Sequence, residues 1–207
     1  MAVKQKVKGV PPQTATDAPN DLQTYKEAVN ELARLRSSLI FQNDNINHAS
    51  IVIEAIIENS EKEVLIYDDK LNGDISDKSS SFLETVNEFV VAHHGSVKIV
   101  VEDTNGGNES NIETVLRNLV KVHPGKVDVR KQSAEFRNEI GRVCQRLQIQ
   151  TKVHYTVGDS RMFRLEFPAG PRKALCSFNS SAVAGQLRKP FDVAFGTCEK
   201  YFQTETA

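Results

Sequence analysis

Two stretches of the C-terminal third carry the side chains best suited to chemistry, Lys152 to Asp159 and Ala174 to Asn179. Alternation along the first stretch places Lys152, His154 and Thr156 on one side of a strand and apolar residues on the other. A cation and an imidazole on one face could together hold a phosphate group. A half-buried strand with a solvated outer face produces the same alternation, so the pattern alone leaves both interpretations open.

The elements that must position these stretches follow from hydrophobic periodicity. Helices are expected at 49–57, 82–90, 112–119 and 136–147, and apolar strands at 64–67, 97–101 and 127–129. This order is typical of an α/β domain with a mixed, largely parallel sheet flanked by helices. Segments 152–157, 162–167 and 173–178 predict an antiparallel addition to that sheet. A last helix begins near Asn179, and Pro190 is expected to kink or restart it.

The N-terminal part divides into a leader and a helix. Residues 1–20 contain three prolines and little that could be buried, which predicts a disordered leader. Residues 21–42 show helical spacing of apolar side chains, with Asp21 as an N-cap candidate, and predict an additional N-terminal helix. That helix either docks on its own domain or forms a dimer. Residues 43–203 are then the α/β domain.

Composition excludes several classes. A hydrophobic content of 39% with 26% charged residues is ordinary for a globular protein. Three cysteines without paired spacing argue against a disulfide framework, and the five histidines form no metal-ligand spacing with them. No apolar run approaches the roughly 18 residues that span a bilayer. We therefore expect no cofactor, no bound metal, no membrane partner and a cytoplasmic location.

Charge is unevenly distributed along the chain. Residues 21–129 contain 10 Lys/Arg against 19 Asp/Glu, whereas residues 130–200 contain 13 against 6. The C-terminal part could present a basic surface to an anion. Alternatively, the two parts complement one another across the fold.

The C-terminal stretches resemble the motifs of phospholipase D-like proteins, a superfamily that includes phosphodiesterases and nucleases. That family carries H-x-K-x4-D on one strand and turn, then G-S-x-N on a later strand. Here Lys152-x-His154-x4-Asp159 has the same spacing with the first two residue types exchanged, and residues 176–179 read C-S-F-N. The resemblance implies a phospholipase D-like half at 43–203, which would need a homodimer partner to supply a second motif.

In that family, a nucleophilic imidazole, a cation and amide or hydroxyl donors converge on one phosphate. The resemblance implies that Lys152, His154, Ser177 and Asn179 bind the phosphate, with His154 as the candidate catalytic residue. Lysine is a poor nucleophile at neutral pH, and His154 lies two residues along the strand, about 6.5 to 7 Å from the family position. We therefore expect a degenerate motif that binds phosphate without cleaving it.

Charged residues near the motif are candidates for supporting roles. Arg164 and Glu166 share a strand face and could form an ion pair. The residues expected to support the motif are Asp159, Arg164 and Glu166. The residues expected to contact a nucleic-acid backbone are Arg161, Arg172 and Lys173.

Three functional hypotheses follow. The first is a non-catalytic phospholipase D-like module that binds a phosphate-containing ligand, foremost nucleic acid, as a dimer or as a subunit of a bacterial complex. The second is an active, metal-independent phosphodiesterase or nuclease that uses His154. The third is a protein–protein interaction module with an inert motif, in which the N-terminal helix carries assembly with other protein subunits.

Overall fold

A computed structural model describes residues 19–69, 80–102, 111–167 and 173–202. Residues 1–18 of the predicted leader, and Arg172, lie outside the described residues. The helices are α1 Pro19–Arg34, α2 Ile46–Glu58, α3 Ser80–Ala92, α4 Asn111–Val122, α5 Ala134–Arg146 and α6 Ser181–Ala194. The strands are β1 Phe41–Asn43, β2 Glu63–Asp68, β3 Ser96–Val101, β4 Val127–Lys131, β5 His154–Gly158, β6 Met162–Glu166, β7 Ala174–Ser177 and β8 Glu199–Lys200.

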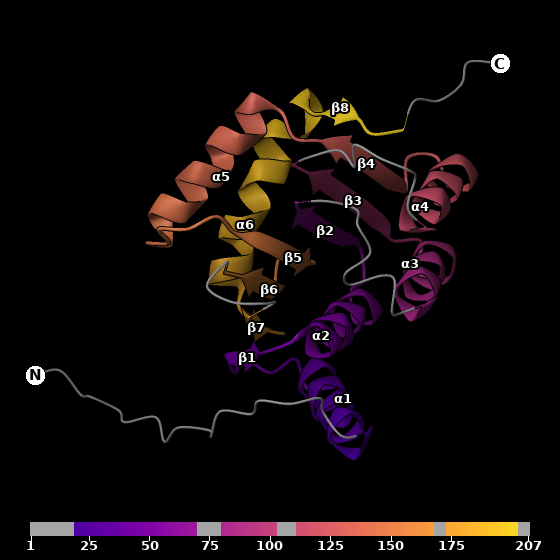
Figure 1. Cartoon of the computed structure of the whole chain (residues 1–207), viewed down its shortest axis with the longest axis vertical. Helices are drawn as coiled ribbons and strands as arrows, with labels where there is room; N and C mark the ends of the chain where they lie inside the picture. Colours follow the sequence, from indigo (N-terminus) through magenta and orange to yellow (C-terminus); the bar gives the residue numbers. More distant parts are fainter. Residues whose placement is uncertain (1–18, 70–79, 103–110, 168–172, 203–207) are drawn as a thin grey trace, which may run out of the picture.

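The described strands form one mixed sheet in the order β1-β7-β6-β5-β2-β3-β4-β8 (Figure 1). Parallel pairing joins β2 to β3 and β3 to β4, and helices α3 and α4 make the two crossovers. The other pairings between described strands are antiparallel. The α/β class and the mixed sheet expected from the sequence are confirmed, but the sheet is mostly antiparallel, because parallel pairing between the described strands is confined to β2, β3 and β4.

Helices cover both faces of the sheet (Figure 1). Helices α5 and α6 enclose one core with β5, β6 and part of β2, and α2, α3 and α4 enclose another with β2, β3 and β4. Helix α1 packs on α2, and together they cover β6 and β7 through a third apolar cluster. The apolar faces predicted for these helices are therefore the faces that pack on the sheet.

The N-terminal helix is shorter than the sequence suggested. It ends at Arg34, and Arg36 has a φ of 47°, a left-handed conformation that terminates helices. Residues 41–43 form the edge strand β1, which pairs antiparallel with β7. The Phe41 ring lies 5.8 Å from that of Phe178, so burial of this aromatic residue favours the sheet over a longer helix.

The predicted antiparallel addition is confirmed as the meander β5-β6-β7, whose first strand also pairs antiparallel with β2. Asp159 and Ser160 both have positive φ, the geometry of a tight hairpin turn. Helix α6 continues through Pro190, so it does not restart there, and β8 and Phe202 close the far edge of the fold. None of the described helices has the length and hydropathy needed to cross a bilayer.

Candidate functional site

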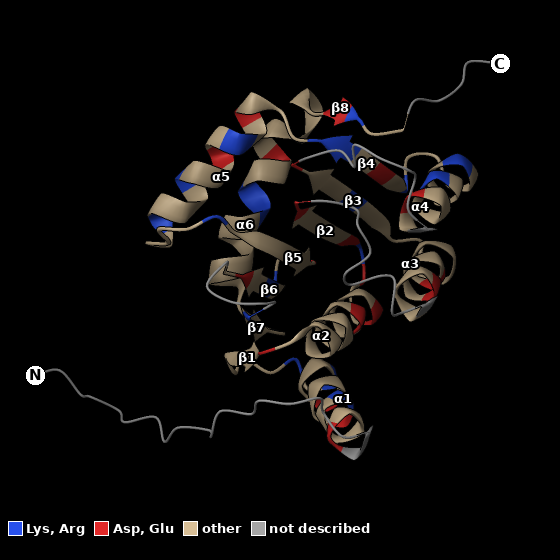
Figure 2. Cartoon of the chain, in the orientation of Figure 1, with Lys and Arg blue, Asp and Glu red and all other residues tan. Residues whose placement is uncertain are grey.

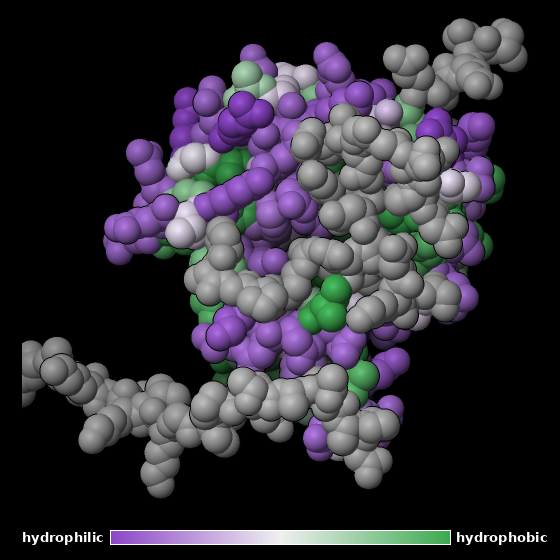
Figure 3. Space-filling view, in the orientation of Figure 1, coloured by the Kyte–Doolittle hydropathy of each residue, from purple (hydrophilic) through white to green (hydrophobic). Residues whose placement is uncertain are grey.

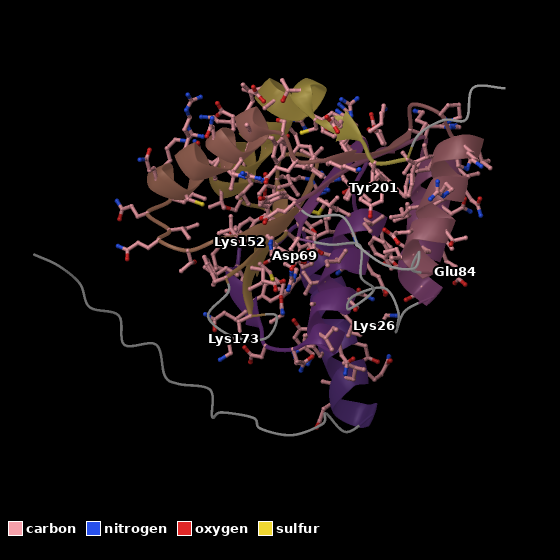
Figure 4. All side chains as sticks on the ribbon, turned by 45° about the horizontal axis from the view of Figure 1, so that its top comes forward. Lys26, Asp69, Glu84, Lys152, Lys173 and Tyr201 are labelled. Carbon is pink, nitrogen blue, oxygen red and sulfur yellow. The ribbon has the colours of Figure 1, made fainter. Side chains whose placement is uncertain are left out.

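A polar cluster lies where the central strands end. Parallel strands β2 and β3 finish at the same edge of the sheet, and antiparallel β5 begins there, with Tyr155 paired to Tyr67. The register therefore brings together residues that are far apart in the sequence. We call this set the edge cluster; it consists of Asp68, Asp69, Glu102, Lys152 and His154. Figure 4 labels Lys152 and Asp69 in this central region.

His154 lies between two carboxylates. Its Nδ1 is 3.7 Å from Asp68 Oδ1, its Nε2 is 3.6 Å from Glu102 Oε1, and its side chain is 17% exposed. Burial lowers the pKa of His154, but Glu102, Asp68 and Asp69 together outweigh burial and raise that pKa above 6.5. The protonated imidazole, which has no lone pair for nucleophilic attack, therefore persists to higher pH than in a free histidine.

Glu102 is held by three neighbours. Its Oε1 accepts a hydrogen bond of 2.5 Å from the Tyr67 hydroxyl, which in turn accepts one of 2.6 Å from Gln132 Nε2. The Lys152 ammonium forms an ion pair with Oε2. Burial raises the pKa of Glu102, but contacts with His154, Lys152 and Tyr67 outweigh it and lower the pKa to about 2. Glu102 is thus a fixed carboxylate at neutral pH.

The charge of the edge cluster bears on its ligand. The carboxylates of Asp68, Asp69 and Glu102 face one ammonium and one imidazole, so the cluster is anionic in either state of His154. An anionic cluster repels a bare phosphate. The residues on which the phosphate prediction rested, Lys152 and His154, are thus each compensated by carboxylates.

A groove opens beside the cluster, between α5 and the segment that precedes β5. It encloses about 470 Å³ and shares Glu102 and Gln132 with a neighbouring cleft of about 550 Å³. We call it the α5 groove; it is lined by Tyr67, Glu102, Gln132, Arg137, Ile140, Gly141, Cys144, Gln145, Ile149, Gln150, Thr151 and Lys152. Figure 3 shows hydrophobic surface among hydrophilic side chains beside α5.

Ser177 and Asn179 do not join the edge cluster. His154 pairs with Glu166, which pairs with Ala174, whereas Ser177 lies three residues further along β7. Two strand spacings and three residues place the Cα atoms of His154 and Ser177 about 14 Å apart. Ser177 is buried and accepts from the Asn179 backbone N–H at 3.4 Å. His154 and Ser177 therefore lie at opposite ends of the meander, and only Asp159 of the first motif segment lies at the Ser177 end.

Asp159 and Arg161 serve the turn that joins β5 to β6. The Asp159 carboxylate accepts backbone N–H groups of residues 61–63 at 2.6, 2.9 and 3.1 Å. Arg161 donates to the carbonyl oxygens of Asn59 and Phe178 at 2.7 and 3.2 Å. Both side chains therefore bind the backbone of their own fold, away from the edge cluster.

Arg164 and Glu166 form the ion pair that their shared strand face suggested. The Arg164 Nη1 lies 2.8 Å from Glu166 Oε2, and the Arg164 Nε donates to Asn43 Oδ1 at 3.0 Å. The Arg164 side chain is 2% exposed, so it cannot meet a ligand in solution. Lys173, by contrast, is exposed.

Several basic residues of the C-terminal part neutralise acidic residues of the N-terminal part. Arg188 lies 2.7 Å from Glu63, Lys200 lies 2.8 Å from Asp128, and Lys152 pairs with Glu102. These contacts favour charge complementation across the fold. Basic side chains also remain exposed on α5, Arg137 and Arg146 among them, interspersed with acidic ones (Figure 2).

Sequence reasoning missed the acidic residues of the cluster and the cation on α5. Asp68 and Asp69 directly follow the predicted strand 64–67, and Glu102 follows 97–101. Because neighbouring parallel strands end at one edge, these positions signal a shared site. Arg137 carries no comparable signal in the sequence.

Comparison with known proteins shows likeness at the level of structure. No family model matches the sequence, and no curated protein is significantly similar to it. TrmBL2, described as an archaeal chromatin protein with a novel mode of DNA binding, aligns with a TM-score of 0.51 and 16% identity over 87% of this chain and 64% of its own. A phosphatidylserine synthase of Haemophilus influenzae aligns with a TM-score of 0.39 and 14% identity over 74% of this chain and 37% of its own. The chain thus spans less than two thirds of either protein, and the likeness to TrmBL2 is one of fold.

Proposed function

We propose that the chain is a non-catalytic, phospholipase D-like module that binds a phosphate-containing ligand, foremost a nucleic acid, in the α5 groove. The observation that carries this proposal is the composition of the groove. The apolar part of its lining, which we call the floor, includes Tyr67, Ile140 and Ile149, and the lining also includes the cations Arg137 and Lys152 and the Glu102 carboxylate that pairs with Lys152. A nucleotide has matching parts, a flat base with an apolar face and an anionic phosphate.

Each part of the groove has a task in this proposal. The Arg137 guanidinium and the N–H groups of Lys152 that do not face Glu102 donate to phosphate oxygens. The apolar floor receives a base, and the amides of Gln145 and Gln150 hydrogen-bond to its edge. A volume of about 470 Å³ suits one nucleotide unit of a longer strand. An unpaired strand is favoured, because its bases can leave the stack and enter the groove.

The geometry also supports the non-catalytic part of the proposal. The donors that the family uses to stabilise a phosphoryl group would come from Ser177, whose Cα lies about 14 Å from that of His154, and from Asn179. Lysine occupies the family's histidine position. Displacements of about 1 Å already impair catalysis, so the separation argues for binding alone.

The wider setting belongs to the same proposal. A fold shared with a chromatin protein described as binding DNA supports nucleic acid as the ligand class. We assign the chain to the cytoplasm. We also assign it to a homodimer, because its single motif would need a second copy from a partner. Exposed Leu35, Leu39 and Ile40 next to the edge strand β1 would suit such an interface.

Fluorescence anisotropy with labelled single-stranded DNA and RNA tests the proposal. Binding should weaken as salt rises from about 50 to about 200 mM, because phosphate contacts release counterions. The double variant Arg137→Ala/Lys152→Ala should bind at least about tenfold less tightly, since charged hydrogen bonds contribute about 1.5–3 kcal/mol each. The matched control is Lys26→Ala/Lys121→Ala, which removes two exposed cations on α1 and α4.

Two results would overturn the proposal. The first is the absence of binding at low salt, or equal affinity for the double variant and the parent. The second is cleavage of the labelled strand that disappears in His154→Ala, which would replace a binding module with the nuclease alternative.

A further inference from the structure

We propose that Asp68, Asp69 and His154 bind one divalent cation, of the Mn²⁺ or Zn²⁺ class, independently of the ligand proposed for the α5 groove. Each residue offers one ligand atom, and these atoms all lie within 4.8 Å of one another. The His154 Nδ1 is 3.7 Å from Asp68 Oδ1. Ligands about 2.1 Å from a common ion are about 3 to 4.3 Å apart, so a small closure of these side chains forms the site.

The second nitrogen of His154 gives an independent indication. Its Nε2 is shielded from solvent and has no hydrogen-bond partner among the described residues, while Glu102 Oε1 lies 3.6 Å away. A histidine that binds a metal through one nitrogen usually donates its other N–H to a carboxylate. Glu102 is placed for that role, because Tyr67 and Lys152 hold its two oxygens.

The candidate ligands sit on a rigid base. Asp68 ends β2, His154 begins β5, and the two strands are hydrogen-bonded through the register Tyr67 to Tyr155. The Asp69 N–H donates to Asp68 Oδ1 at 2.8 Å, which fixes the Asp68 carboxylate against the backbone of Asp69. Asp68 and His154 therefore need little ordering when an ion binds, which favours affinity.

Charge and ligand type define the ion. The edge cluster is anionic in either state of its imidazole, so a dication offsets the repulsion between Asp68, Asp69 and Glu102. Two carboxylates with one imidazole suit Mn²⁺ and Zn²⁺ better than Ca²⁺, which prefers six or more oxygen ligands. Three protein ligands also leave positions for water or another ligand.

Isothermal titration of the full chain with MnCl₂ and ZnCl₂, after chelator treatment and without nucleic acid, tests the site. We expect one ion per chain and weaker binding of CaCl₂. Asp69→Asn and His154→Gln should each reduce affinity at least about tenfold, and Glu102→Gln should reduce it about 10- to 100-fold. Glu84→Gln, at an exposed position on α3 labelled in Figure 4, is the matched control and should bind as the parent does.

The outcome is decided by these affinities. Absence of Mn²⁺ and Zn²⁺ binding, or equal affinity in the parent, Asp69→Asn and His154→Gln, overturns the site and leaves an ion pair between Asp68 and His154. Circular dichroism identifies any variant that fails to fold, and Asp69→Asn, which keeps the His154 contacts, then decides. Arg137→Ala should lose nucleic acid but keep Mn²⁺, so the two proposals fail separately.

Discussion

Replacing Glu166 by glutamine tests whether charges expected to support a phosphate site instead stabilise the fold. The Glu166 carboxylate lies 2.8 Å from the Arg164 guanidinium, and their side chains are 10% and 2% exposed. The Arg164 Nε also donates to Asn43, which links β6 to the edge strand β1. Glutamine keeps the size of glutamate and removes its charge. The variant therefore removes the negative charge that Glu166 places beside the buried guanidinium.

The expected loss is large because solvent cannot replace that carboxylate. Removing one partner of a buried ion pair costs about 3–5 kcal/mol, whereas replacing both partners by apolar residues is often neutral. Glu166→Gln should therefore lower the free energy of unfolding by about 3 kcal/mol or more. Arg164→Met/Glu166→Leu should recover most of that loss, since it removes both charges together.

Urea unfolding followed by far-UV circular dichroism measures these differences, provided that the slope with urea stays constant. Glu31→Gln is the control, because it breaks the exposed ion pair with Arg34 and should leave the midpoint unchanged. A Glu166→Gln midpoint that moves no more than the control refutes the reasoning. So does a double variant as unstable as the single one, since the loss would then come from packing.

Four further predictions concern other parts of the fold. Gly158→Ala should lower the free energy of unfolding, measured with urea, by about 1–3 kcal/mol, because a Cβ at this position would lie 2.5 to 2.9 Å from three side-chain atoms. A variant as stable as the parent would contradict this prediction. Asp159→Ala should lower the free energy of unfolding by about 1.5–3 kcal/mol, because three backbone N–H groups lose their acceptor. The same variant should bind the labelled nucleic acid as tightly as the parent does in the anisotropy assay. Burial and a nearby carboxylate raise the pKa of Glu58 above 4.5, so the folded protein loses stability as the pH rises through that pKa and Glu58 ionises. Glu58→Gln, which cannot ionise, should therefore raise the urea midpoint near pH 7 but not near pH 3. Leu39→Lys/Ile40→Lys should convert the proposed dimer to monomer in light scattering, and an unchanged mass would exclude this interface.

Periodicity predicted the central elements because burial imposes it. The strand at 64–67 and the helix at 82–90 lie within β2 and α3, and the helix at 136–147 ends one residue beyond α5; apolar side chains of all three face a core. The stretch of residues 36–42 was predicted wrongly, as part of a helix. Its local spacing is helical, but contacts with β7, more than 130 residues away, decide its conformation. Sequence pattern does not contain such distant pairing.

The candidate site was predicted in part for a similar reason. The alternation around His154 correctly predicted a strand, but its polar face is not the expected one, because β5 begins only at His154 and Thr156 is buried like Tyr155. The alternation could not reveal that the carboxylates of Asp68 and Glu102 lie beside the His154 imidazole, because these two residues lie at the ends of other strands. Ion pairing of Arg164 with Glu166 was predictable, since residues two apart on a strand share a face.

The spacing of the motif has a structural explanation that does not require catalysis. Strand β5 is five residues long, so a residue at its start and one in its turn, His154 and Asp159, are necessarily separated by four others. Asp159 then binds the backbone that leads into β2, at the end of the strand opposite His154. A hairpin of this length reproduces the motif spacing whether or not a phosphate is bound. The chemistry at His154 depends instead on the ends of β2 and β3, so a motif contained in one strand cannot specify a site built from three.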